Sequence, residues 1–156
     1  MAITLNASTS PTTGLITTAD ASGELTLQTN GTNALALVSG AVVNPTVRNY
    51  TEAVVAIGTV TTSNTISLTN GTVQTATLTA STACTFTMPT ATAGKSFILL
   101  LRQAASTGNG SATFTGVKWS TAGAPIITAT AGSMDILSFV SDGTNWYGSY
   151  IQGYTP

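Results

Sequence analysis

The side chains that could perform acid–base chemistry in this chain are five carboxylates, because the sequence contains no His. They are Asp20, Glu24, Glu52, Asp135 and Asp142. The lack of His excludes Ser-His-Asp and Cys-His catalysis. A glycosidase needs two carboxylates that face each other at a cleft, and Asp135 and Asp142 offer such a pair if they meet across a hairpin. The simpler interpretation is that strand alternation turns Asp135 toward solvent and that Asp142 belongs to a turn, so we expect no catalytic residue and no enzyme.

Ligand sets for metals and phosphate are equally sparse. Residues 142–145 offer oxygens of the kind that Ca²⁺ binds, but the same residues make an ordinary type I′ hairpin turn, which is the interpretation that we favour. Zn²⁺ needs His and Cys clusters, and Cys84 is the only cysteine. Gly94-Lys95-Ser96 resembles the end of a phosphate-binding loop, but Pro89 stands where that loop requires its first Gly. We therefore expect no metal site and no cofactor, and we expect Cys84 to be a small buried hydrophobe.

Four aromatic residues lie within nine positions near the C-terminus of the sequence: Trp146, Tyr147, Tyr150 and Tyr154. Tyr and Trp combine apolar area with a polar group, so the cluster is a candidate interaction surface for a carbohydrate or a receptor. The interpretation that we favour is that Trp146 fills a hydrophobic core while the tyrosines line a contact between subunits, where aromatic residues are enriched.

The elements that must position these residues are built from an unusual composition. Of the 156 residues 33 are Thr and only 6% are charged, against about 25% in an ordinary soluble domain. The net charge of −1 leaves no basic patch that could neutralise several phosphates, so we expect no nucleic-acid partner. Mean hydropathy is +0.32, yet the longest strongly apolar run, residues 97–101, is far shorter than the roughly 20 residues of a membrane-spanning helix. The apolar surplus therefore indicates burial between proteins and no membrane partner.

Residues 1–50 are predicted to form an extended arm with short strands. Short alternating runs contain Leu25 and Leu27, and then Leu35 and Leu37, separated by residues that favour turns. These runs are too short and too weakly apolar to close a core alone. We expect them to contact other subunits, and the four leucines join the aromatic cluster as candidate interaction residues.

Residues 51–156 are predicted to form an all-β domain of the sandwich or jelly-roll kind. About eight short strands are separated by turns every 8–12 residues. Asn70-Gly71 stands between two alternating runs and predicts a β-hairpin. Residues 95–103 are nearly all apolar in the middle, which predicts a central strand buried on both faces, and residues 125–130 predict a further strand.

Several of these stretches carry a resemblance: residues 70–79, Phe86, and residues 93–103, 117–119, 124–125, 134–139 and 142–148. Together they resemble a β-domain that is common in structural proteins of tailed bacteriophages, often near the C-terminus of fibre-like proteins. Residues 14–31 are similar to the openings of virion proteins from phages of aquatic bacteria. The resemblance implies a virion structural protein and offers no catalytic residue.

The sequence therefore predicts a structural component of a phage virion. Our first hypothesis is a head decoration or cement protein on the capsid exterior, a homotrimer whose partners are copies of itself and the major capsid protein. The alternative is a short tail fibre or receptor-binding subunit, in which residues 146–154 would contact host glycans. A third hypothesis, a carbohydrate-active enzyme, requires the paired carboxylates.

Overall fold

The computed structural model describes residues 28–29, 32–33 and 48–156, and backbone contacts divide the chain into two units, Met1–Arg48 and Asn49–Pro156. In the first unit, strands β1 (Gln28–Thr29) and β2 (Thr32–Asn33) pair antiparallel. The candidate contact residues Leu25, Leu27, Leu35 and Leu37, like most of the predicted arm, lie outside the described residues.

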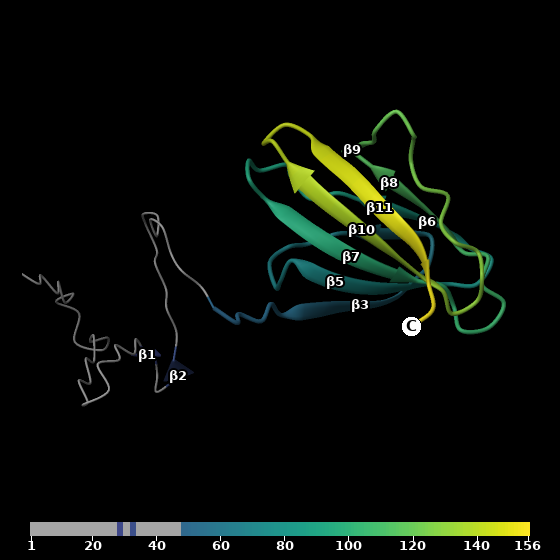
Figure 1. Ribbon diagram of the computed structural model, residues 1–156, viewed down its shortest axis with the longest axis horizontal. Coiled ribbons are helices and arrows are strands. Elements are labelled where there is room, and N and C mark those ends of the chain that lie inside the picture. The colour runs from purple at the N-terminus through teal and green to yellow at the C-terminus, as the bar shows by residue number, and fades with distance from the viewer. Residues whose placement is uncertain (1–27, 30–31, 34–47) are drawn as a thin grey trace, which may run out of the picture. The chain divides into compact units, whose positions relative to one another are not determined.

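The second unit consists of β-strands in two sheets, which confirms the predicted all-β class. Its nine strands are β3 (Val54–Val60), β4 (Ser63–Thr65), β5 (Val73–Leu78), β6 (Ala83–Thr87), β7 (Ser96–Arg102), β8 (Ser111–Thr115), β9 (Val117–Lys118), β10 (Met134–Ser141) and β11 (Trp146–Tyr154). One sheet has six strands in the order β3-β5-β7-β10-β11-β9, and the other has three in the order β4-β6-β8 (Figure 1). Among the described residues there is no helix that could cross a membrane.

The chain winds between the two sheets in a solenoid-like manner. From β3 to β8 consecutive strands alternate between the six-stranded and the three-stranded sheet, and neighbours within each sheet, β3-β5-β7 and β4-β6-β8, are parallel. Strand β10 then pairs antiparallel with β7, and β11 antiparallel with β10. A jelly roll has antiparallel neighbours throughout, so the two facing sheets here are connected differently from that fold.

The predicted hairpin at Asn70-Gly71 is wrong, because β4 and β5 on either side of it belong to different sheets. Gly71 has a φ of 155° and Asn70 has no positive φ, which is not the type I′ conformation. Gly71 instead allows a close approach of backbones, since a Cβ there would lie 2.7 Å from the Ala53 carbonyl oxygen. The buried amide of Gln74 holds this connection by donating to the carbonyl oxygens of Ser67 at 2.6 Å and Gly71 at 3.2 Å.

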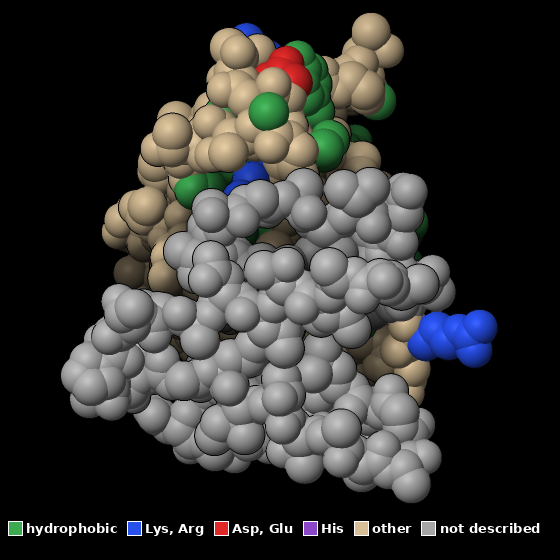
Figure 2. Space-filling model, turned by 90° about the vertical axis from the view of Figure 1, so that its left-hand side faces the viewer, with side chains coloured by type: hydrophobic (Ala, Val, Ile, Leu, Met, Phe, Trp, Pro, Cys, Tyr) green, Lys and Arg blue, Asp and Glu red, His purple; other side chains and the backbone are tan. Residues whose placement is uncertain are grey.

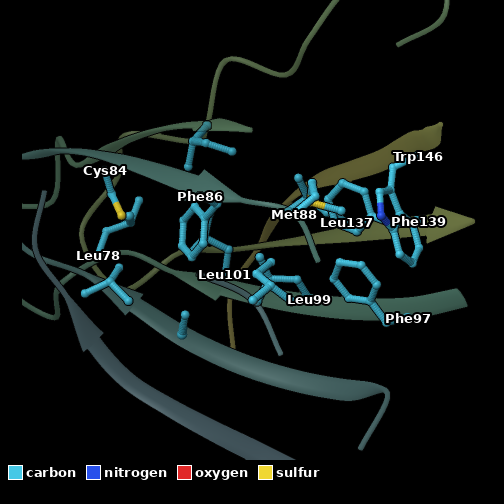
Figure 3. Close-up of a cluster of buried hydrophobic side chains, with 14 residues drawn as sticks. Leu78, Cys84, Phe86, Met88, Phe97, Leu99, Leu101, Leu137, Phe139 and Trp146 are labelled. Atoms are coloured by element: carbon cyan, nitrogen blue, oxygen red, sulfur yellow. The ribbon is translucent and has the colours of Figure 1, made fainter. Parts of the chain in front are cut away.

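The hydrophobic core lies between the two sheets and follows the period-two alternation of strands. Every second residue of β5, β6, β7 and β10 is buried. Figure 3 shows the labelled core side chains of both sheets meeting in one layer: Leu78, Cys84, Phe86, Met88, Phe97, Leu99, Leu101, Leu137, Phe139 and Trp146. The prediction that Cys84 is a small buried hydrophobe is confirmed, and burial raises the pKa of its thiol.

Candidate interaction face

The outer side of the six-stranded sheet carries most of the exposed large hydrophobic residues in the described part of the chain. The nearly continuous apolar run of residues 95–103 predicted a strand buried on both faces, but only the inner side chains of β7 are buried. Six exposed large hydrophobics lie on this outer side: Val54, Ile98, Val140, Tyr147, Ile151 and Tyr154. We call this surface the apolar face. Patches of this kind on soluble proteins mark interaction sites.

Strand register arranges the apolar face in rows that run across the sheet. The first row contains Ser96, Val140, Tyr147 and, on the edge strand β9, the charged Lys118. The second contains Val54, Val73, Ile98, Ser138 and Ser149. The third contains Ala56, Thr75, Leu100, Ile136 and Ile151, and the fourth Thr59, Thr77, Arg102, Met134 and Tyr154. On β10 and β11, large residues of the third row therefore adjoin serines of the second.

Two hollows lie on this face. One, of about 430 Å³, is lined along the first two rows by residues that include Ile98, Val140 and Tyr147, with Glu52 and Thr72 at its rim. The other, of about 350 Å³, lies along the third and fourth rows and is lined by Ala56, Gly58, Thr75, Ala76, Thr77, Leu100, Arg102 and Met134. The face is therefore uneven, and protruding side chains of a partner would find room on it.

Charged groups are confined to the two ends of the face. At the end of the first row, the Glu52 carboxylate accepts a hydrogen bond from the Thr72 hydroxyl, and the Tyr147 hydroxyl donates to Asp142 Oδ2 at 2.9 Å. Hydrogen bonds from the backbone N–H groups of Asn145 and Thr144 lower the pKa of Asp142, and the Tyr147 hydroxyl lowers it further. The hydrogen bond to this carboxylate, together with its negative charge, raises the pKa of Tyr147. At the opposite end, Arg102 is the cation of the fourth row.

The outer side of the three-stranded sheet has a different character. Its outward positions hold only small residues, most of them hydroxyl-bearing: Ser63, Thr65, Ala83, Thr85, Thr87, Ser111, Thr113 and Thr115. We call this surface the hydroxyl face. The Oγ1 atoms of Thr85 and Thr113 lie 3.2 Å apart and bond to each other. Figure 2 shows that the described surface on one side of the molecule is mostly uncharged, with a few separate charged side chains.

Asp135 does not face solvent as the alternation with its neighbours predicted; its side chain is 1% exposed. The Thr128 backbone N–H donates to Oδ2 at 2.8 Å and the Gly153 N–H donates to Oδ1 at 2.9 Å. The Gln152 amide donates to Oδ2 at 3.3 Å. A register shift in β11 opposite Asp135 brings the last two donors to it. The carboxylate is therefore a structural hydrogen-bond acceptor.

Asp135 also helps to explain why residues 125–130 form no strand. Backbone groups of this segment bond to side chains instead of to a neighbouring strand. The buried Gln103 amide donates to the Thr128 carbonyl oxygen at 2.8 Å, and Gln152 donates to the Ile126 carbonyl oxygen. Side chains from distant parts of the sequence therefore satisfy backbone groups that a neighbouring strand would otherwise pair.

The carboxylate pair required for a glycosidase is not formed by Asp135 and Asp142. The predicted turn at Asp142 is present, and its carboxylate accepts the N–H groups of Thr144 at 2.8 Å and Asn145 at 2.7 Å. The turn connects β10 and β11 through four residues, not a type I′ pair, because only Gly143 among them has a positive φ. Seven residues of extended strand separate the two aspartates by about 23 Å, far beyond the roughly 5–9.5 Å of glycosidases.

The aromatic cluster is divided between the two sides of β11. Trp146 is 2% exposed, packs edge-on against Phe97 at 5.3 Å, and donates to the Pro89 carbonyl oxygen at 2.8 Å, so it cannot meet a partner. Tyr150 also points inward and lies 5.9 Å from Trp119. Tyr147 and Tyr154 point outward at opposite ends of the apolar face.

Sequence reasoning missed the apolar contribution of Ile98, Val140 and Ile151 to this surface. Their alternation with buried residues was the available signal, and for Ile98 the continuous apolar run of β7 concealed it. Among the described residues, no group of three or more His, Cys, Asp or Glu side chains could hold a metal ion.

Comparison with protein-family models, with curated proteins and with solved structures finds no match to this chain.

Proposed function

We propose that this chain is a structural component of a phage virion, a capsid decoration protein that stabilises the head shell by association with the major capsid protein and with copies of itself. The observation that carries the proposal is the apolar face, whose exposed Val, Ile and Tyr side chains suit broad contact with another protein surface. The phage resemblance of the strand sequences supports the assignment to a virion.

The low charge of the surface supports an assembly role over recognition of a charged molecule. Only nine residues of the whole chain are charged, so attachment would depend mainly on apolar burial and shape. Contact made in this way is screened little by salt. Repetition over a shell would then multiply many modest contacts into stable attachment.

The proposal is tested on virions of the phage that encodes the chain. Antibody carrying gold should label the head, and capsids assembled without the chain should melt at a lower temperature than complete capsids in calorimetry. Adding back purified chain should restore the melting temperature. Equal melting temperatures with and without the chain would overturn the decoration role.

A second candidate is a short tail fibre or receptor-binding subunit, and one observation favours it. Tyr147 borders the hollow of about 430 Å³, with hydroxyl and carboxylate groups of Ser96, Thr72 and Glu52 beside it. An aromatic ring next to hydroxyls and a carboxylate suits a sugar. Gold labelling of the tail, together with host-glycan binding that Tyr147→Ala abolishes and Tyr50→Ala preserves, would establish this candidate in place of the first.

A further inference from the structure

We propose that two copies of this chain pack through their apolar faces. The two-fold axis lies in the plane between the two faces and runs parallel to the rows, between the second and third rows, so that each row of one copy meets a row of the other along the same strand. The inference shares with the proposed function only the idea that copies associate, and it concerns purified protein without a capsid. The decoration-protein hypothesis drawn from the sequence expected a homotrimer. The arrangement of residues on the face favours two.

The first argument is the contrast between the two outer surfaces of the same fold. Six of the eight exposed large hydrophobics of the described residues lie on the apolar face and none on the hydroxyl face. Exposed apolar area lowers the free energy when it is removed from water, by about 25 cal/mol per Å². Only one of the two faces therefore gains from being covered.

The second argument is the match of large to small residues under the two-fold rotation. In an isologous contact each surface meets a rotated copy of itself. An axis between the second and third rows places Ile136 of one copy over Ser138 of the other, and Ile151 over Ser149. Large residues facing small ones let two layers interdigitate. Leu100 meets Ile98 in the same arrangement, which keeps the centre apolar.

The third argument is charge. The same rotation exchanges the first and fourth rows, so that Arg102 of each copy comes over Ser96 of the other, at the hollow that Glu52 also lines. Glu52 and Arg102 are the acid at the rim of the hollow along the first rows and the cation of the fourth row. Two opposite-charge pairs would flank an uncharged centre, the arrangement of an apolar core and a polar rim.

The size of the face is sufficient. Five strands at about 4.8 Å spacing and four rows over about 20 Å give roughly 500 Å² in projection. The accessible area of an uneven surface exceeds its projection. The value therefore approaches the roughly 800 Å² per partner of a standard specific interface.

The first test is the mass of the full-length chain in solution by analytical ultracentrifugation. The expected mass is twice the 15.7 kDa of the chain. Ile151→Lys should yield the monomer, because Ile151 lies in the third row and is 63% exposed, so the fold tolerates the change. Ile126→Lys is the matched control, because Ile126 is 90% exposed in a loop outside the face, and it should leave the dimer intact. A wild-type monomer, a trimer, or an Ile151→Lys dimer would overturn the inference.

The second test addresses the axis itself. Glu52→Arg and Arg102→Glu should each weaken dimerisation by about tenfold or more, since two-fold symmetry applies each charge reversal twice. The double variant should return close to the wild-type dissociation constant. A double variant as weak as the single ones would overturn the predicted pairing.

The third test is cross-linking of single introduced cysteines. Sheets pack about 10 Å apart, which places the two Ser138 positions about 12 Å from each other, within reach of a short bismaleimide. Ser138→Cys should therefore cross-link into dimers, whereas Ser111→Cys on the hydroxyl face should not. Cys84 is buried and stays out of the reaction. Equal cross-linking at both sites would contradict the predicted face, and capsid binding without dimerisation would leave the proposed function standing alone.

Discussion

Replacement of Asp135 by Ala should destabilise the second unit because it removes an acceptor on which two backbone N–H groups depend. The N–H groups of Thr128 and Gly153 donate to this carboxylate at 2.8 and 2.9 Å. A donor left without a partner costs about 1–3 kcal/mol. Gly153 is exposed and can turn to water, and the substitution also removes the cost of burying a carboxylate. The expected loss is therefore about 1–3 kcal/mol, the cost of the one donor, the Thr128 N–H, that is left without a partner.

Urea denaturation of the full-length chain measures this loss, and amide hydrogen exchange assigns it. Exchange at Thr128 and Gly153 should accelerate in the Asp135→Ala variant. Asp135→Asn should lose less, because its one remaining carbonyl oxygen can serve Thr128. The control Asp142→Ala removes the exposed carboxylate of the β10–β11 turn and should cost less than Asp135→Ala. A loss below about 1 kcal/mol, with unchanged exchange at both amides, would refute the structural role of Asp135.

Four further predictions concern close contacts and titrating groups. Gly148→Ala should reduce stability by about 1–3 kcal/mol and change Trp fluorescence, because a Cβ there would lie 2.4 Å from the Trp119 ring; unchanged emission would contradict it. Tyr147 should ionise at a higher pH than free tyrosine in ultraviolet titration, and Asp142→Asn should reverse that rise. In the folded state the pKa of Asp142 is lowered. The stabilisation that Asp142 contributes is therefore present above its ordinary pKa of about 3.9 and is lost as the pH falls through the folded value. A Tyr147→Phe variant should lose less stability over that acid range, because it lacks one of the hydrogen bonds that lower this pKa. Cys84 should react with a thiol reagent only after denaturant is added, and fast labelling of the native chain would show that it is accessible.

Much of the core could be predicted from the sequence, because alternation alone identifies inward residues. Cys84, Phe86 and Met88 alternate with threonines along β6 and just after it, and all three are buried. What alternation cannot provide is the identity of the neighbouring strand. Asn70-Gly71 has the residues of a hairpin, yet the amide of Gln74 on the following strand holds an arch between the sheets at that place.

The positions of the candidate site residues were predicted only in part, because the two N–H groups that hold Asp135 are not local in sequence. Tyr147 and Tyr154 were named as candidate contact residues from their type, and both are exposed. Asp135 was assigned to solvent because charged side chains usually lie outside, and its acceptor role depends on N–H groups from a loop before β10 and from a register shift in β11. The alternation of residues along β10 alone gives no sign of either N–H donor.

The scarcity of charge in this chain has different consequences on its two outer surfaces. Both sheets alternate inward residues that are mostly apolar with outward residues that are mostly uncharged, so the pattern is similar on each. The size of the outward side chains differs: Thr and Ser on β6 and β8, but Ile, Val, Leu and Tyr on β7, β10 and β11. Hydroxyl-bearing residues can remain in water at little cost, whereas large apolar residues favour a partner. Contact between copies should therefore be confined to one side, which leaves the hydroxyl face free in the dimer.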